Sequence, residues 1–173
     1  MAYTWVKVDK FDIDDEWNSL YEDSKEDLNG GTVIQNPDWS EDEKKQYMIK
    51  LMNEQDVHNQ YNIKIYKDGV PVMFNHCVFQ DNIFLWVTGI VAKVNNSKAW
   101  TWTSEFHQAN KSWIQSIGGT KFAIECIKGA RIDTYFTAGT NEGICLGTLE
   151  EEDTDNNMKR MIWTSVSYTH LRA

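Results

Sequence analysis

The sequence predicts a single mixed α/β domain, in a form that is also described as α+β. The hydrophobic period switches repeatedly between 3.6 and two residues, which indicates that helices and strands are interspersed along the chain. Residues 83–127 read as strand, helix, strand, and this order requires a parallel crossover. A chain of 173 residues is long enough for one hydrophobic core and too short for two.

The first third of the chain predicts one short strand and two helices. Residues 3–8 alternate in polarity and form the strand. Apolar residues spaced by three and four from Ile13 to Leu28 predict a helix that ends at Gly30-Gly31. Ser40 and Glu43 form a capping box, which announces a second helix whose pattern fades near Val57.

The middle of the chain predicts three consecutive strands. The period of two begins at Asn62, and Asp68-Gly69 is a strong hairpin signal before a return strand from Val70 to Val78. After a turn at residues 80–82, the apolar run 83–92 predicts a central strand that is buried on both faces and has a bulge at its glycine, Gly89.

The last part of the chain predicts a long helix followed by shorter elements. Trp102, Phe106 and Trp113 share one helical stripe, which ends at Gly118-Gly119. The elements expected after it are a strand at 121–127, a short helix at 131–136, a strand at 143–149, a polar turn at 150–157 and a strand at 158–164. The predicted order is therefore β-α-α-β-β-β-α-β-α-β-β.

Charge and composition narrow the classes of partner. A net charge of −9 argues against nucleic acid, because binding to nucleic acid rests on basic side chains that neutralise phosphates. Residues 61–120 carry five basic and three acidic side chains, so an anion is expected there. The chain has no apolar stretch that could span a membrane, and its three scattered cysteines indicate reduced thiols, so we expect a cytoplasmic protein.

The end of the chain has a different character. Residues 165–173 resemble a translated sequencing-adapter tail that recurs at the ends of metagenomic reading frames. We therefore expect a domain at 1–164 followed by a non-native tail. The apparent metagenomic source favours a phage-encoded protein that works in the host cytoplasm.

The predicted order over residues 3–164, with the strand stretch Val87–Ile90 and the motif Tyr135–Gly139, resembles the GNAT N-acetyltransferase superfamily. In that fold the central sheet parts between its fourth and fifth strands, and acyl-coenzyme A enters between them. The resemblance implies an acyl-coenzyme A-dependent N-acyltransferase. Its cofactor would be acetyl-CoA or another acyl-CoA, and its acceptor would be an amine on a small molecule or a peptide.

The resemblance also implies roles for individual residues. The strand residues Thr88, Gly89 and Val91 would bind the pantetheine arm and the thioester. Tyr135 would protonate the departing thiolate, and an ordinary phenol pKa near 10 suits this role. Glu125 is the expected base, with His76 as the other candidate. The pyrophosphate would lie at the start of the long helix, where the residues expected to bind it are Lys93, Asn95, Asn96, Ser97 and Lys98. No metal site is expected.

A second hypothesis remains open. Residues 95–100 do not follow the glycine-containing phosphate loop of the family. The alternative is a GNAT-like binding or assembly protein without catalysis, in an oligomeric state that the sequence does not specify. Cys126 reads as a buried strand cysteine rather than a nucleophile.

Overall fold

A seven-stranded mixed sheet forms the centre of the molecule. The computed structural model describes residues 3–27, 38–55, 59–93, 106–129, 133, 137, 145–154 and 156–165. The strands lie in the order β1-β2-β3-β4-β5-β7-β6, and their bounds are β1 Tyr3–Val8, β2 Asn59–Lys67, β3 Val70–Gln80, β4 Ile83–Val91, β5 Lys121–Ile127, β6 Thr148–Asp153 and β7 Met158–Thr164. Only β4 and β5 pair in parallel, and every other neighbouring pair is antiparallel.

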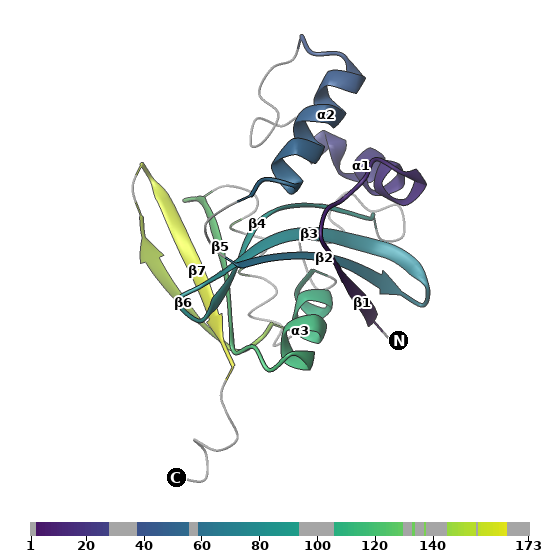
Figure 1. The fold of residues 1–173 in the computed structure, drawn as a ribbon. Helices are drawn as coiled ribbons and strands as arrows, with labels where there is room; N and C mark the ends of the chain where they lie inside the picture. The colour runs from purple at the N-terminus through teal and green to yellow at the C-terminus, as the bar shows by residue number, and fades with distance from the viewer. Residues whose placement is uncertain are drawn as a thin grey trace, which may run out of the picture.

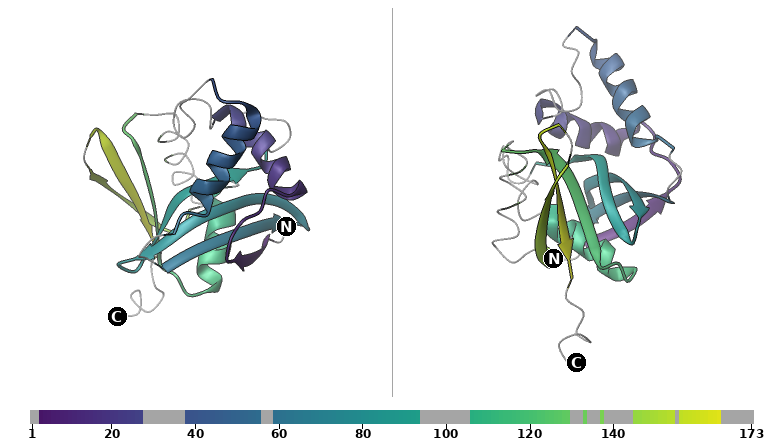
Figure 2. Two further views of the ribbon diagram at one scale, coloured as in Figure 1. Left: turned by 45° about the horizontal axis from the view of Figure 1, so that its top comes forward. Right: turned by 90° about the vertical axis from the view of Figure 1, so that its left-hand side faces the viewer.

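Three helices of the described residues cover the two faces of this sheet. Helices α1 (Asp15–Asp27) and α2 (Glu41–Met52) lie on one face, and α3 (Phe106–Ser116) lies on the other (Figures 1 and 2). Helix α3 connects β4 to β5, so the predicted parallel crossover is confirmed. None of the described helices has the length and apolar composition of a membrane span.

The sheet divides the hydrophobic core into two clusters. On the α3 side, Trp113, Phe122 and Trp163 are at most 2% exposed and belong to one cluster of buried side chains. On the α1/α2 side, Trp17, Met48 and Phe74 are fully buried. Each such side chain contributes about 1.5–3 kcal/mol on burial, so both faces contribute to stability.

Most elements form where the pattern predicts them. The strands at 3–8, 121–127 and 158–164 have the expected bounds, and the capping box of Ser40 and Glu43 is present at the start of α2. The Asp68-Gly69 turn has positive φ angles at both residues, as does the Asp81-Asn82 turn. Two-residue turns of this hand match the twist of the strands that they join.

Two expectations about the end of the chain are wrong. The acidic residues Glu150 to Asp153 lie in β6 rather than in a turn, because each pairs with a residue of β7. This strand begins at Thr148, five residues after the predicted start. The turn itself is Asn156-Asn157, where both φ angles are positive. Charged side chains on an edge strand discourage pairing with a second sheet, which explains why this strand is so acidic.

A buried polar network fixes α3 against β3 and β4. Asn110 of α3 accepts hydrogen bonds from Asn75 Nδ2 at 2.8 Å and from Trp113 Nε1 at 2.9 Å through its Oδ1. Asn75 in turn accepts a bond of 3.0 Å from Trp86 Nε1. Because Asn75 and Asn110 are at most 1% exposed, this network sets the position of α3 more specifically than apolar contacts alone would.

Replacing Asn110 with leucine should therefore destabilise the fold. The Asn110→Leu variant removes the acceptor of two buried donors, and an unsatisfied buried donor costs about 1–3 kcal/mol. We expect the free energy of unfolding in urea to fall by about 2–5 kcal/mol. The exposed Gln108 of the same helix provides the control, because Gln108→Leu should change this free energy by less than about 0.5 kcal/mol. Equal effects of the two variants would contradict the network's role.

Candidate functional site

Strands β4 and β5 touch over only three positions and then part. Phe84, Leu85 and Trp86 pair with Phe122, Ala123 and Ile124. Beyond these pairs β4 continues to Val91 alongside β3, and β5 continues to Ile127 alongside β7. Figure 1 shows the two strands diverging from this common start. We call the side of Val87–Val91 that faces away from β3 the open edge of β4, because no strand of the described residues pairs with it.

The bulge of β4 lies at Val87 and not at Gly89. Trp86 pairs with Cys77 and Thr88 pairs with His76, so Val87 is the extra residue between them. Its side chain is 47% exposed, which also corrects the expectation of a strand buried throughout. A bulge bends its strand and increases the local twist. It stands directly after the last pair with β5, where β4 turns away from that strand.

Gly89 is not the bulge residue, and its lack of a side chain serves the buried network. An added Cβ at this position would lie 2.7 Å from Asn75 Oδ1 and 2.7 Å from the Phe74 carbonyl oxygen. A side chain here would displace Asn75 from its bond with Trp86, so glycine permits the buried network to form beside the bulge.

The open edge presents the backbone groups of Gly89 and Val91. The Ala92 N–H donates to the Val72 carbonyl of β3, and successive residues of a strand direct their N–H groups to opposite edges. Val91 therefore faces away from β3, and so does Gly89 two residues earlier. Thr88 directs its backbone toward β3 and buries its side chain to 7% exposure.

Helix α1 already occupies part of this edge. The Val91 N–H donates to Ser24 Oγ at 2.7 Å, and the same hydroxyl donates to the Val91 carbonyl at 2.8 Å. Two residues further along the chain, the Lys93 N–H donates to Asp23 Oδ2 at 3.1 Å. Val91 and Lys93 were predicted to bind the cofactor, but both backbone groups of Val91 and the N–H of Lys93 are engaged within the chain. Sequence analysis missed Ser24 and Asp23, because contacts across 67 and 70 residues leave no local signal.

Glu125 lies on the opposite strand, just past the point of parting. Phe122, Ile124 and Cys126 pack into the core on the α3 side, so Glu125 projects to the α1/α2 side. Arg160 Nε of β7 donates to Glu125 Oε1 at 2.9 Å, and the guanidinium also bonds to this oxygen through Nη2. The carboxylate is 37% exposed and has a fixed orientation.

His76 is the other candidate base, and its surroundings differ. It lies between Asn62 and Thr88 in a row across β2, β3 and β4, and it is 2% exposed. Its Nδ1 lies 2.6 Å from Asn62 Oδ1, and Asn62 Nδ2 donates to the Asp9 carbonyl. Because the amide oxygen only accepts, Nδ1 carries the proton. The histidine is therefore a buried, oriented residue, whereas Glu125 is accessible.

Several predicted site residues lie outside the described residues. These are Tyr135 and the expected phosphate-binding residues Asn95, Asn96, Ser97 and Lys98. The predicted helix at 131–136 is described only at Asp133, which is helical, as is Thr137 after it. The roles implied for this group stay predictions.

Two other chemistries would need a reactive cysteine nucleophile or a metal site among the described residues. Burial raises the pKa of the Cys126 thiol to about 11, with a smaller contribution from the Asp133 carboxylate. The thiol is protonated at neutral pH and is a poor nucleophile. Among the described residues, no three His, Cys, Asp or Glu side chains gather as metal ligands would.

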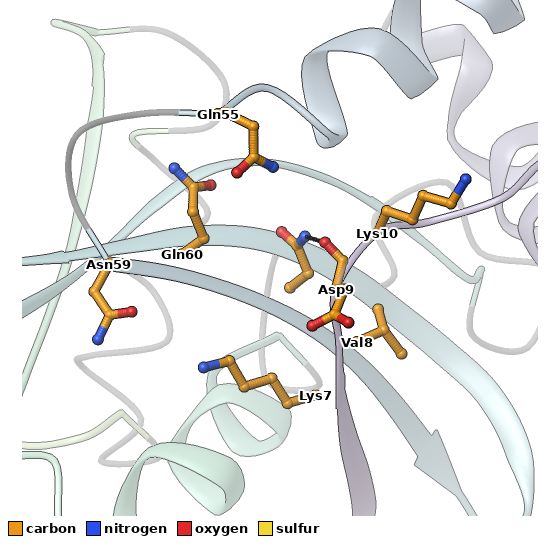
Figure 3. Close-up of a pocket in the computed structure, with 8 residues that line it drawn as sticks. Lys7, Val8, Asp9, Lys10, Gln55, Asn59 and Gln60 are labelled. Atoms are coloured by element: carbon orange, nitrogen blue, oxygen red, sulfur yellow. Dashed lines mark hydrogen bonds between the residues drawn. The ribbon is translucent and has the colours of Figure 1, made fainter.

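A pocket of about 540 Å³ is lined by residues of β1, β2 and the segments next to them. Figure 3 shows the polar ends of Lys7, Asn59 and Gln60 around it, from β1 and β2. In the sheet order, β3 lies between these two strands and β4. The pocket is therefore separate from the open edge.

Comparisons with known proteins identify the fold. No family model and no curated protein sequence matches the chain. Solved structures do match over nearly the whole chain. The PaiA N-acetyltransferase from Thermoplasma acidophilum, in complex with coenzyme A, is similar with a TM-score of 0.54 at 13% identity, over 95% of this chain and 99% of that one. The chain has the GNAT fold.

Two further structures with the GNAT fold show the same extent of similarity. The Campylobacter jejuni N-acetyltransferase PseH, in complex with acetyl coenzyme A, has a TM-score of 0.52 at 8% identity, over 95% of this chain and 100% of that one. The ribosomal-protein-S18-alanine N-acetyltransferase from Escherichia coli has a TM-score of 0.50 at 11% identity, with 96% of each chain covered. At such identities the similarity establishes the fold alone.

The Ser24 contact predicts a measurable stability effect. In Ser24→Ala the Val91 N–H and carbonyl lose their partner, so the free energy of unfolding should fall by about 1–3 kcal/mol. Ser19→Ala is the matched control, because Ser19 is exposed on the same helix. Chemical denaturation of both variants measures the difference. If both variants unfold at the wild-type denaturant concentration, the contact contributes nothing.

Proposed function

We propose that the protein is an acyl-coenzyme A-dependent N-acyltransferase that transfers an acetyl or other acyl group to an amine. The observation that carries this proposal is the parting of β4 and β5 after three paired positions, which leaves the backbone of Gly89 facing an unpaired edge. Backbone donors at such an edge suit the amide and thioester oxygens of a pantetheine arm. The presence of coenzyme A or acetyl coenzyme A in two structures with the same fold supports this ligand class.

The residues present fit such a ligand in part. Gly89 directs its N–H group and its carbonyl away from β3, toward the open edge. At the end of β4, Lys93 is half-buried and introduces the segment expected to bind the pyrophosphate. The Asp23 carboxylate, which accepts the Lys93 N–H, is negatively charged and would repel a phosphate. The pantetheine arm would therefore pass Gly89, and the pyrophosphate would lie beyond Lys93 at the basic side chains expected there.

The proposed reaction divides the proton transfers between two residues. Glu125, oriented by Arg160 on the α1/α2 side, accepts a proton from the acceptor ammonium group. The amine nitrogen then forms a bond to the acyl carbon as the bond from that carbon to sulfur breaks. The nitrogen loses its second proton to solvent, while Tyr135 donates its phenolic proton to the departing thiolate and regains one from solvent. The acceptor is an amine on a small molecule or a peptide.

One observation favours the second candidate function, a GNAT-fold binding or assembly protein without catalysis. Ser24 satisfies both backbone groups of Val91, so half of the open edge is already paired within the chain. An acyl-coenzyme A would then have fewer backbone partners on β4. The second candidate predicts that the protein does not bind coenzyme A.

Titration with acetyl-coenzyme A separates the two candidates. The transferase predicts a calorimetric binding signal and release of free thiol when a panel of primary amines is added. Tyr135→Phe should lower the rate of thiol release by about 100-fold or more while the dissociation constant for acetyl-coenzyme A changes by less than about threefold. Tyr47→Phe is the control, because Tyr47 is a half-buried tyrosine of α2, and this variant should retain the wild-type rate.

Two results of the same titration would contradict the transferase. If acetyl-coenzyme A produces no heat and no amine in the panel releases thiol, the protein is not an acyltransferase. Binding of acetyl-coenzyme A without release of thiol would contradict both candidates, because the second predicts no binding.

A further inference from the structure

A largely buried ion cluster ties the segment after β5 to the last two strands. Lys159 Nζ of β7 lies 2.6 Å from Asp133 Oδ1 and 3.0 Å from Glu151 Oε1 of β6. The side chains of Lys159 and Asp133 are only 12% and 14% exposed. An ion pair with so little solvent around it is screened less than a surface pair, and loss of one partner leaves an uncompensated charge.

Asp133 also accepts hydrogen bonds from residues before and after it in the chain. Its Oδ2 accepts the Gly129 N–H at 3.0 Å, which fixes the turn that follows β5. Its carbonyl accepts Thr137 Oγ1 at 2.9 Å, four residues along the chain. Gly129 and Thr137 are therefore both bonded to Asp133, and Asp133 is paired with Lys159.

The charges of the cluster reinforce one another. Burial alone would raise the pKa of Asp133, but the bonds from Lys159 and Gly129 outweigh it and lower this pKa. Burial likewise disfavours the charged form of Lys159, yet the two carboxylates raise the pKa of its ammonium group. Both shifts favour the charged forms of Asp133 and Lys159, and the Lys159 ammonium group lies between the carboxyl groups of Asp133 and Glu151.

We propose that Lys159, through its ion pair with Asp133, is a positioning residue for the segment that carries Tyr135. This inference rests on the proposed function, in which Tyr135 supplies the proton to the thiolate. Tyr135 lies in the sequence between Asp133 and Thr137, the two residues that the cluster holds. The cluster contacts neither the open edge of β4 nor Glu125 among the described residues, so it affects the rate of thiol release rather than binding of the acyl donor.

The structure offers a matched control for this cluster. Lys128 Nζ lies 2.8 Å from Asp153 Oδ1, so it also joins the turn after β5 to β6. These side chains are 38% and 77% exposed, and such surface pairs contribute little. Lys128→Met therefore removes the same charge from the same region without loss of a buried ion pair.

The test measures two quantities in Lys159→Met, Lys128→Met and wild type. One is amide hydrogen exchange in peptides that cover residues 129–139, and the other is steady-state kinetics with acetyl-coenzyme A. We expect Lys159→Met to speed exchange in those peptides by about tenfold or more and to lower kcat by about tenfold or more. The KM for acetyl-coenzyme A should change by less than about twofold. Lys128→Met should match wild type in both measurements.

Two additional variants show whether the effect is electrostatic and local. Lys159→Arg keeps the charge and should restore both values to within about threefold of wild type. Lys159→Met combined with Glu151→Gln removes the repulsion that the single variant leaves, so it should exchange more slowly than Lys159→Met alone. Lys159→Arg also keeps the test informative if Lys159→Met fails to fold.

The two proposals fail in different ways. Exchange in Lys159→Met equal to that in wild type overturns the positioning role, whether or not the protein is active. A parallel loss of kcat and of affinity for acetyl-coenzyme A overturns it as well. Wild-type protein that neither binds acetyl-coenzyme A nor releases thiol refutes the transferase, and with it the catalytic purpose of the cluster, even where the exchange result holds.

Discussion

Separation of β4 from β5 is the constraint on which the rest of the structure depends. The two strands are joined at three positions, and the bulge at Val87 turns β4 away directly after the last of them. Each strand then follows a different partner. The network of Trp86, Asn75 and Asn110 fixes β4 and β3 to α3, and ladder pairing keeps β5 on β7. Because both partners are rigid, the strands cannot close on each other without the loss of buried hydrogen bonds.

An unpaired strand edge inside a domain has an energetic cost, and α1 reduces it. Buried backbone groups without partners are rare, and Ser24 provides both a donor and an acceptor to Val91. The same contact withdraws Val91 from any ligand. Among the described residues, no strand pairs with Gly89 on this edge, and under the proposed function an acyl donor would bind its backbone groups. The Ser24 contact thus stabilises the edge and shortens the length of it that the proposed acyl donor could bind.

The sequence predicted the elements better than their contacts. Periodicity located the strands at 121–127 and 158–164, and the turn signal Asp68-Gly69 marked the β2–β3 hairpin, since these features arise from neighbouring residues. A bulge was predicted in this strand at Gly89, but its position at Val87 could not be predicted, because it depends on the register against His76 and Cys77. Glu150 to Asp153 read as a turn because an edge strand tolerates charges on both faces. The contacts of Ser24 with Val91 and of Lys159 with Asp133 join distant segments and have no local pattern.

Amide hydrogen exchange at Gly89, with and without acetyl-coenzyme A, tests the central claim most directly. The account predicts that in the free protein the Gly89 amide exchanges faster than the amides of its neighbours Thr88 and Ile90, whose N–H groups face β3, because the N–H of Gly89 faces an unpaired edge. Added acetyl-coenzyme A should slow exchange at Gly89 by about tenfold or more and leave the Val91 amide, already bonded to Ser24, nearly unchanged. A Gly89 amide that is fully protected in the free protein, and unaffected by the ligand, would contradict the claim that β4 and β5 part there.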